Sequence, residues 1–583
     1  MEFNDIKTRN ELANFLNIPK KQLSYILYIK GINNYYTSFE IPKKNGGSRK
    51  INAPNDEIKD IQRKLVFALN QHNRKNQRKL NKISHAFEEN KSIITNAKVH
   101  RNKRFVLNID LENYFESFHF GRVRGFFSKN KNFLLPIEVA TIIAQISCYE
   151  GKLPQGSPSS PIISNLISEI LDNRILSIAK KYKVYYTRYA DDLTFSTNDK
   201  NFLNLQTEFY EEISKEITKA GFSINEKKRR LQFKDSRQVV TGLVVNKKIN
   251  VNRTYYKDTR SMAHQLYKHG KFEINGEPGS LNQLEGRFAF INQLTWYNNK
   301  LDGEKHNFHY LSSREKQYQK FLFYKYFFAN PRPLIVTEGK TDITYIKSAL
   351  KNLYLDYPNL ITKNSNGIFE FKISFLKKTK RLAYFLKINQ DGGSALNHIY
   401  NFYDIKKNSA PNYMHLLKAI SNTSPSNPVI LMFDNEIKSE GKKPIGNFLN
   451  HTKLETKKKS KLSNDYLVNI VDNLYLLTVP LVDGKAECDI EDLFDDDVLA
   501  QIIEGKTFTK KDDYDHSKYY GKEIFSRHIE AEYTNINFDR FRPVFDNMNT
   551  IIETYKKECV KIAPNLDPMH SVNSNLDQVP LEV

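Results

Sequence analysis

The chain has 583 residues, enough for several domains, and its 39% hydrophobic and 12% aromatic content excludes a disordered or collagen-like protein. Its 89 Lys and Arg residues outnumber its 66 Asp and Glu residues, which gives a formal net charge of +23. This excess, together with many Tyr and Phe residues, favours a nucleic-acid partner, because phosphates attract cations and unpaired bases stack on aromatic rings. A net charge of this size can also serve only to keep the protein soluble.

Neither the cysteines nor the apolar segments indicate export or membrane insertion. Cys148, Cys488 and Cys559 lie too far apart in sequence to form a zinc cluster or a disulfide framework, which predicts a reducing compartment. The first residues lack the apolar core of a signal peptide, and no apolar stretch approaches the ~18 residues of a membrane-spanning helix. We therefore expect a cytoplasmic protein with no membrane partner.

The sequence pattern changes twice along the chain. Residues 1–240 mix helical patterns with short β-rich runs, and residues 241–328 become helical and aromatic. The segment 330–333 (NPRP) then interrupts the helix, because residues before proline avoid helical geometry. A strand, a turn and a helix follow over residues 334–350. We predict domains at 1–240, 241–328 and 329–583, with an exposed loop or a frayed helix at 453–461.

Two β-rich runs in the first part carry three carboxylates. Residues 105–110 (FVLNID) end in Asp110, and residues 189–192 (YADD) place Asp191 and Asp192 at the predicted turn between two strands. Adjacent acids on an apolar hairpin repel each other, so a bound cation is the natural compensation. Two Mg²⁺ ions held there can activate an attacking 3′-hydroxyl and stabilise a leaving pyrophosphate. A solvated Asp-Asp turn is the alternative.

Four motifs in one order extend this pattern: FVLNIDLENYFESF (105–118), LPQGSPSSPIISNL (153–166), YADDLTFS (189–196) and GFSINEKKRR (221–230). Over about residues 40–310 the chain thereby resembles reverse transcriptases. The resemblance implies an α+β right-hand polymerase with fingers, palm and thumb, in which Asp110, Asp191 and Asp192 bind Mg²⁺. It also implies that Phe115 blocks a ribose 2′-hydroxyl and so selects deoxynucleotides, although packing in the core would equally explain a Phe there.

Two further segments are candidates to contact the nucleotide. Gln155 lies in a Gly-containing loop that leads into an apolar helix, so its side chain can approach a base or sugar. The run 41–51 (IPKKNGGSRKI) predicts a hairpin with a basic tip, the fingers of the family that the motifs resemble, where Arg49 or Lys50 could grip the triphosphate of a dNTP. A merely solvated hairpin is the alternative.

Two short elements narrow the resemblance to retron reverse transcriptases. Residues 96–100 (NAKVH) match the NAxxH element, and residues 240–242 match the VTG element. The residues concerned are Asn96, Ala97, His100, Val240, Thr241 and Gly242. The resemblance implies recognition of a structured non-coding RNA that is both template and primer, and a branched RNA–DNA product, multicopy single-stranded DNA (msDNA). His100 as an ordinary surface histidine is the alternative.

A second set of acids follows the Pro-containing boundary. Residues 334–338 (LIVTE) end a buried-type strand at Glu338, and a second apolar run, 429–433 (VILMF), is followed by Asp434 and Glu436. Acids at the ends of two strands of an α/β sheet can meet at one edge and hold Mg²⁺. Solvated strand ends are the alternative for any one of these acids.

These segments resemble a Toprim domain of the overcoming-lysogenization-defect nuclease type, through VTEGKTD (336–342) and MFDNE (432–436). The resemblance implies an α/β, Rossmann-like domain with one or two Mg²⁺ ions and metal-dependent phosphodiester hydrolysis. Looser matches are DGGS (391–394) and CDIEDLF (488–494), in which Glu491 and Asp492 are second-rank candidates, with an acidic solvated surface as the alternative.

Together the resemblances imply an RNA-directed DNA polymerase fused to a Toprim nuclease that acts in antiphage defence. Two alternatives remain: a mobile-element or group II intron-like reverse transcriptase, or a non-catalytic nucleic-acid scaffold in the second half. The expected partners are the non-coding RNA, msDNA, dNTPs and the nucleic-acid target of the nuclease. The sequence leaves open whether the chain forms a homo-oligomer.

Overall fold

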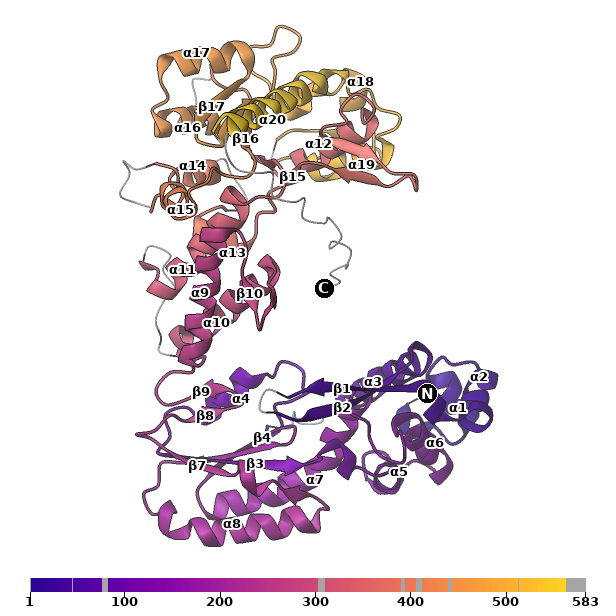
Figure 1. The fold of residues 1–583 in the computed structure, drawn as a ribbon. Helices are drawn as coiled ribbons and strands as arrows, with labels where there is room; N and C mark the ends of the chain where they lie inside the picture. The colour runs from indigo at the N-terminus through magenta and orange to yellow at the C-terminus, as the bar shows by residue number, and fades with distance from the viewer. Residues whose placement is uncertain are drawn as a thin grey trace. The chain divides into compact units, whose positions relative to one another are not determined.

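The computed structural model describes residues 2–43, 46–75, 82–301, 303, 310–389, 394–404, 411–438, 443–511 and 513–562 (Figure 1). The chain divides into two compact units. Unit 1 comprises Met1–Tyr256 and Leu294–Glu304, and unit 2 comprises Lys257–Gln293 and Lys305–Val583. Each is described by itself.

Unit 1 combines helices with short strands. Its helices are α1 (Arg9–Phe15), α2 (Lys20–Ser24), α3 (Asp56–Lys75), α4 (Ile93–Val99), α5 (Phe120–Lys129), α6 (Ile137–Ser147), α7 (Ser160–Lys181) and α8 (Phe202–Lys219), with a 3₁₀ turn η4 (Phe115–Ser117). Its strands are β1 (Tyr36–Pro42), β2 (Ser48–Pro54), β3 (Phe105–Glu112), β4 (Tyr185–Tyr189), β5 (Asp192–Thr197), β6 (Ser223–Ile224), β7 (Arg230–Phe233), β8 (Val239–Val240) and β9 (Leu243–Val244). The predicted hairpins at 41–51 and 185–196 are confirmed as β1–β2 and β4–β5.

The central sheet of unit 1 has the strand order β4-β5-β3-β6, with β7 also paired to β3, and all of these pairings are antiparallel. Strand β3 is buried over most of its length, because the Val, Leu and Ile side chains of both its faces are covered. Helix α7 packs against β4 and α8 on one face of the sheet, where Figure 1 shows both helices.

The two faces of β4 have different partners, as the two-residue period of a strand requires. Tyr186 and Arg188 both reach Asp172 of α7. Thr187, between them, points to the other face and contacts Asn96 and the ring of His100, next to α4. The sheet is therefore covered on one side by α7 and α8 and on the other by α4.

Unit 2 is built around a second sheet. Helix α9 (Arg253–His269) begins just before it and α10 (Leu281–Leu301) ends in unit 1. The other helices are α11 (Ser313–Phe323), the π-helix η7 (Tyr324–Phe328), α12 (Thr341–Asn352), α13 (Lys380–Leu386), α14 (Ser394–Tyr400), α15 (Tyr413–Ser421), α16 (Pro444–Thr452), α17 (Thr456–Asp465), α18 (Asp496–Leu499), α19 (Lys522–Glu532) and α20 (Arg542–Ile562). The strands are β10 (Glu273–Ile274), β11 (Glu277–Pro278), β12 (Leu334–Val336), β13 (Ile361–Lys363), β14 (Phe369–Phe371), β15 (Ser374–Phe375), β16 (Val429–Phe433), β17 (Leu467–Val471), β18 (Leu474–Thr478), β19 (Thr507–Phe508) and β20 (Tyr519–Tyr520).

The sheet of unit 2 has the order β15-β12-β16-β18-β17, in which only β17 is antiparallel to its neighbour. Alternate residues of its strands enter two different cores. Ile335, Ile430 and Leu477 pack with α12, α19 and α20, whereas Val336 and Leu431 pack with α11 and the segments from α13 to α17. A mainly parallel sheet buried on both faces is an α/β arrangement, and it explains why its strands are continuously apolar.

The structural division differs from the predicted boundaries near 240 and 330. The aromatic side chains of α11 and η7 bury against the same core as β12 and β16, so residues 330–333 lie within a unit and do not separate two units. Part of the segment predicted to be an exposed loop or frayed helix, 453–461, is the helix α17, which Leu462 anchors by its burial.

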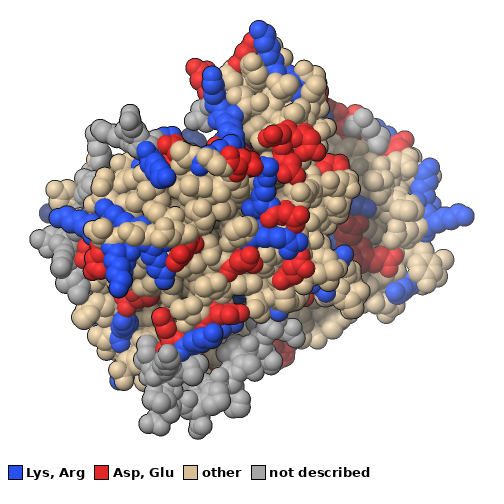
Figure 2. Space-filling model, turned by 90° about the horizontal axis from the view of Figure 1, so that it is seen from above, with Lys and Arg blue, Asp and Glu red and all other residues tan. Residues whose placement is uncertain are grey.

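The positive charge is not gathered into one region on the face drawn in Figure 2, where Lys and Arg are interspersed with Asp and Glu. Among the helices of the described residues, none is both long enough and apolar enough to cross a membrane.

Candidate functional site

The three aspartates of the first set lie together at the junction of three strands. Asp110 on β3 is directly opposite Asp192 on β5, and the amide of Leu111 donates to the carbonyl of Asp191 at 3.0 Å. Between β4 and β5, Ala190 adopts a left-handed φ of 54°, which makes the turn tight enough to place both following acids beside β3.

The electrostatics of the site reflect this crowding. Burial, followed by the charges of Asp191 and Asp110, raises the pKa of Asp192 to about 7. Burial is also the main cause that raises the pKa of Asp191. Lys228 offsets part of the repulsion, because its ammonium lies 2.9 and 3.0 Å from the two carboxylate oxygens of Asp110. Three clustered carboxylates are a donor set that suits Mg²⁺.

The hairpin β1–β2 is tied to the loop that carries Gln155. The amide of Asn52 donates to the carbonyl of Gln155 at 2.8 Å. A Cβ on Gly156, whose φ is 125°, would lie only 2.8 Å from the carbonyl oxygen of Asn52, so glycine is needed for this approach. Burial raises the pKa of Asp191, and the charge of Arg49 opposes a small part of this rise, so the hairpin lies within electrostatic range of the aspartates. Lys50, the next residue, is exposed.

Phe115 is half-buried in η4, five residues after Asp110. Its ring lies 6.2 Å from that of Phe87, which is 52% exposed and has a left-handed φ of 59°. Two aromatic rings, Phe115 and Phe87, thus lie together here, of which the sequence motifs indicated only Phe115.

The residues proposed for RNA recognition are mostly interior. Asn96, Ala97, His100 and Val240 are buried, while Thr241 and Gly242 reach the surface. The His100 ring contacts Ser196 at 2.8 Å and Thr187 at 2.7 Å, so it is a buried and satisfied histidine, and the surface alternative is wrong. Helix α4 packs on β4, β8 and β9, so the two motifs, far apart in sequence, form one packed support behind the central sheet.

In unit 2 the acids that follow β12 and β16 also meet. These strands are parallel neighbours, so their carboxyl ends lie at one edge of the sheet. The backbone amide of Asp434 donates to Glu338 at 3.2 Å. Asn435 forms a bridge with Cys488, which continues the extended geometry past β16 and leaves Asp434 and Glu436 on the side opposite Asn435.

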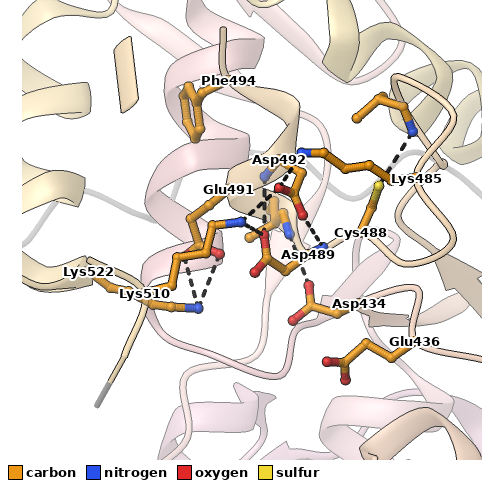
Figure 3. Close-up of polar contacts among 12 residues, drawn as sticks. Asp434, Glu436, Lys485, Cys488, Asp489, Glu491, Asp492, Phe494, Lys510 and Lys522 are labelled. Carbon is orange, nitrogen blue, oxygen red and sulfur yellow. Dashed lines mark hydrogen bonds and ion pairs between the residues drawn. The ribbon is translucent and has the colours of Figure 1, made fainter. Parts of the chain in front are cut away.

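The bridge also brings the segment 488–492 to the site (Figure 3). The amide of Ile490 donates to Asp434 at 3.0 Å. Glu491 is fully buried and pairs with Lys522, and Lys510 pairs with both Asp489 at 2.5 Å and Asp492 at 2.8 Å. The alternative of an acidic solvated surface is therefore wrong for Glu491.

Burial and mutual repulsion raise the pKa values of Glu338 and Asp434. The pKa of Glu338 rises to about 7, mainly through burial, with Asp342 and Glu436 adding to the rise. The pKa of Asp434 lies well above its ordinary value for the same reason, with Glu338 as the strongest neighbouring charge. Lys443 contacts Glu436 at 2.6 Å and partly neutralises the cluster. The donor chemistry again suits Mg²⁺.

Lysines pair with acids in both clusters, and among the described residues no three acidic, histidine or cysteine side chains already surround one point at coordination distance. To bind a metal ion, Asp110 would have to break its ion pair with Lys228, and Glu436 its ion pair with Lys443. The looser DGGS match at 391–394 lies outside the described residues except for the backbone of Ser394.

Sequence reasoning missed the lysines and one further acid of these clusters. Lys228 lies in the motif GFSINEKKRR, and its basic run gave no sign which lysine reaches Asp110. Asp342 was visible in VTEGKTD, and its charge acts on both Glu338 and Asp434. Lys510 and Lys522 carried no local signal, since only folding brings them to the segment 488–492.

Comparison with known proteins matches residues 41–312 to the family model described as reverse transcriptase (RNA-dependent DNA polymerase). The Escherichia coli retron Ec86 reverse transcriptase is 35% identical, and the match covers 41% of this chain and 69% of that protein. The E. coli retron Ec73 enzyme is 33% identical, over 44% of this chain and 82% of the relative.

The Myxococcus xanthus retron Mx65 reverse transcriptase is 30% identical over 45% of this chain, and the match spans only 61% of its length. Among solved structures, telomerase from Candida albicans with a fragment of telomeric RNA shares 10% identity and a TM-score of 0.29, over 49% of this chain and 59% of that one. A TM-score this low does not establish a shared fold. The sequence matches do establish the family, and the chain belongs to the retron reverse transcriptases.

Proposed function

We propose that unit 1 is an RNA-directed DNA polymerase that makes branched msDNA from a structured non-coding RNA. The observation that carries the proposal is the convergence of Asp110, Asp191 and Asp192 on β3 and the β4–β5 turn, beside the hairpin that bears Arg49. Membership of the retron family supports the choice of RNA as both template and primer.

In this proposal each group has a separate task. The three aspartates would hold two Mg²⁺ ions, which when bound lower the barrier for attack of a hydroxyl on the α-phosphorus of a dNTP. The attacking hydroxyl loses its proton, the new phosphodiester forms, and pyrophosphate leaves. Arg49 and Lys50 bind the triphosphate, Gln155 contacts the base or sugar, and Phe115 stacks where a ribose 2′-hydroxyl would lie.

The first step would use an internal guanosine 2′-hydroxyl of the RNA as the primer, as the family resemblance implies. The experiment that tests the proposal is sequencing of the nucleic acid that copurifies with the protein. DNA joined to RNA through a 2′–5′ branch is the expected product. Recovery of only linear RNA from an active preparation supplied with dNTPs would instead favour a mobile-element or group II intron-like enzyme.

For unit 2 we propose a Toprim-like, Mg²⁺-dependent nuclease. Glu338, Asp434 and Glu436 would hold one ion, and Asp342, Asp489 and Glu491, whose charges act on Asp434, are the candidates to hold a second. When bound, the ions would assist attack of water on a phosphodiester. Lys510 and Lys522 oppose the rise that burial causes in the pKa values of Asp489 and Glu491, and each holds one of these side chains in place.

The main alternative for unit 2 is a scaffold that binds nucleic acid without cleaving it. The observation that favours a nuclease is the number of buried carboxylates around Asp434, because such a cluster repels a nucleic acid unless cations neutralise it. Incubation of the full chain with labelled RNA and DNA, with Mg²⁺ and with EDTA, tests this. Metal-dependent cleavage is expected, whereas binding without cleavage would favour the scaffold.

The family resemblance further leads us to propose antiphage defence as the biological role. Plating of phages on cells that carry the intact gene together with its non-coding RNA is the test. Protection that requires both Asp191 and Glu338 is expected. Equal plating with and without the gene, over a broad phage panel, would contradict it.

A further inference from the structure

Helices α9 and α10 lie within residues 41–312, the part of the chain that matches the reverse transcriptase family. Their compact unit is nonetheless unit 2, in which Lys257–Gln293 belong together with Lys305–Val583. In Figure 1 both helices lie beside α11 and α13. Part of the polymerase is therefore packed with residues that lie beyond the family match.

Aromatic rings join α10 to the helices that follow it. Phe288 of α10 stacks on Tyr318 of α11, with ring centres 5.5 Å apart and ring planes 6° apart, and its ring lies 5.2 Å from that of Phe321. The ring of Tyr318 in turn lies 4.8 Å from that of Phe385 on α13. None of these four residues is more than 2% exposed. Interior side chains interdigitate closely, so this packing fixes one face of α10.

The carboxylate of Glu285 ties the same side of α10 to two cations. Glu285 precedes Phe288 by three residues, so the two side chains are neighbours on the helix surface. Nη1 of Arg381 on α13 donates to Oε1 of Glu285 at 2.5 Å, and Nζ of Lys325 in η7 donates to Oε2 at 2.6 Å. The Glu285 side chain is only 15% exposed. A shielded carboxylate with both oxygens paired is held more firmly than an exposed ion pair.

Helix α9 is joined to the second half through η7. The Tyr324 hydroxyl donates to the carbonyl of Leu266 at 3.1 Å, and the rings of Tyr324 and Tyr267 lie 5.0 Å apart. The end of η7 is tied to the start of β18, because the side-chain amide of Asn473 donates to the carbonyl of Phe327 at 3.0 Å. A continuous series of contacts thus leads from α9 and α10 to the sheet of unit 2.

We propose that Glu285 and Arg381 are positioning residues for DNA synthesis. By holding α10 they set how the polymerase grips its template–primer duplex, so the second half of the chain serves the polymerase as well as its own site. The inference rests on the proposed function in one respect, because it takes α9 and α10 as the thumb that grips this duplex. Helix α10 continues from these contacts to Leu301, and its last residues belong to unit 1.

The proposal predicts which kinetic constant changes. Asp110, Asp191 and Asp192 lie in unit 1, so a displaced α10 should weaken binding of the duplex and leave the chemical step intact. Loss of such binding raises KM without lowering kcat. The number of nucleotides added before dissociation should also fall. A merely structural role would instead reduce the amount of active protein, which lowers the apparent kcat at unchanged KM.

The experiment is primer extension by the full-length protein, which gives kcat and the KM for a DNA primer on an RNA template. Glu285→Gln should raise this KM about tenfold, the lower end for loss of a hydrogen bond to a charged group, at unchanged kcat. Arg381→Gln leaves Lys325 in place and should raise the KM about threefold. Arg381→Lys retains the charge and should restore a KM near that of the wild type.

Arg542→Gln is the matched control. Arg542 on α20 also pairs with two carboxylates, those of Asp356 at 2.8 Å and Asp539 at 2.7 Å, and its side chain is 39% exposed, against 46% for Arg381. The KM of this variant should equal that of the wild type. An unchanged KM in both Glu285→Gln and Arg381→Gln would overturn the proposal, as would an equal rise in the control.

The double variant of Glu285→Gln with Arg381→Gln shows whether the two residues act through one contact. Its KM should equal that of Glu285→Gln alone, because the contact is already lost. Increases in KM that multiply would mean that the residues act independently, against the proposal. Thermal unfolding of each variant checks the fold. If Glu285→Gln fails to fold, Arg381→Gln and Arg381→Lys still decide, because Arg381 is exposed.

The wild type separates this inference from the proposed function. If the wild type does not extend the primer, the proposed polymerase is wrong, and this inference with it. If the wild type extends the primer and the variants share its KM, the polymerase stands and only the positioning role is wrong.

Discussion

Arg188 and Asp172 form a two-pronged ion pair behind the turn between β4 and β5, with Nε to Oδ1 and Nη2 to Oδ2 each at 2.8 Å and both side chains fully buried. Nη1 of Arg188 also donates to the carbonyl of Ala190, at 3.3 Å. The pair therefore holds the residue whose left-handed conformation sets the position of Asp191.

Breaking this pair should destabilise unit 1 and impair synthesis together. Asp172→Asn leaves the Arg188 charge buried without its partner, so we expect a loss of about 3–5 kcal/mol in the free energy of unfolding. Calorimetry of the full chain measures it. Arg174→Met, which removes an exposed pair with Glu216, is the control and should cost less than about 1 kcal/mol. Equal losses in the free energy of unfolding for both variants would show that the buried pair contributes no more to stability than the exposed pair.

Asp191→Asn should abolish Mg²⁺-dependent DNA synthesis without unfolding the protein, because it removes a carboxylate charge at nearly constant volume. Primer extension on an RNA template measures the activity, and circular dichroism the fold. Asp235→Asn, an exposed position in the same unit, should extend normally. A well-folded Asp191→Asn protein with normal extension would exclude this residue from the polymerase site.

Glu338→Gln should remove nuclease activity and phage protection while DNA synthesis continues, because the two carboxylate clusters belong to different units. The amide can still accept the Asp434 amide hydrogen, so the local fold should persist. Glu370→Gln, exposed on β14, is the control. Protection of cells by the Glu338→Gln protein at normal expression would favour the scaffold.

Gly156→Ala should weaken dNTP binding, seen as a raised KM in primer extension. The new methyl group would lie 2.8 Å from the Asn52 carbonyl and on a backbone with φ of 125°, so the hairpin β1–β2 must shift. Gly125→Ala, whose added methyl group meets nothing within 4 Å, should leave KM unchanged. An unaltered KM in both variants would mean that the hairpin does not position the triphosphate.

The contribution of His100 to stability should fall as the pH falls. Burial, followed by the charges of His85 and Lys103, lowers the pKa of His100 to about 3. The unfolded histidine takes up a proton near pH 6.5, so the neutral ring contributes fully above that pH. Between pH 6.5 and about 3 the contribution is lost by about 1.4 kcal/mol per pH unit.

Urea unfolding of the wild type and His100→Gln at pH 7.5 and pH 5.5 measures this effect. The wild type should lose more stability over this interval than the variant. His415→Gln, at an exposed position, should lose as much as the wild type. The same pH dependence in all three proteins would contradict the assignment.

The sequence predicted the elements that bear the acids because their signals are local. An apolar run followed by an acid describes both β3 with Asp110 and β16 with Asp434. The partners of these acids could not be predicted in this way. No local sequence pattern marks Lys510 or Lys522 as partners of the acids. Only the bridge between Asn435 and Cys488 shows which segment faces Asp434.

The sequence could not predict whether the short retron motifs lie in the interior or on the surface. A histidine with polar neighbours can lie on the surface or in the interior, and the choice depends on whether Thr187 and Ser196 are available as partners. The compact units also divide at residues other than the predicted boundary near 330, for a related reason. A proline pair signals a local break in the helix, but it does not reveal that the aromatic residues before it pack onto a sheet formed after it.

This packing has a practical consequence for anyone who wishes to express the second half of the chain alone. Phe323 packs on Phe402, Tyr403 and Tyr413, with ring centres 5.5 to 5.9 Å apart, and the carbonyl of Phe328 accepts from the amide of Ser426. A fragment that starts at residue 329 would present these rings to water and aggregate. A soluble fragment has to retain α11 and η7, so that the gene must be cut upstream of the codon for Ser312.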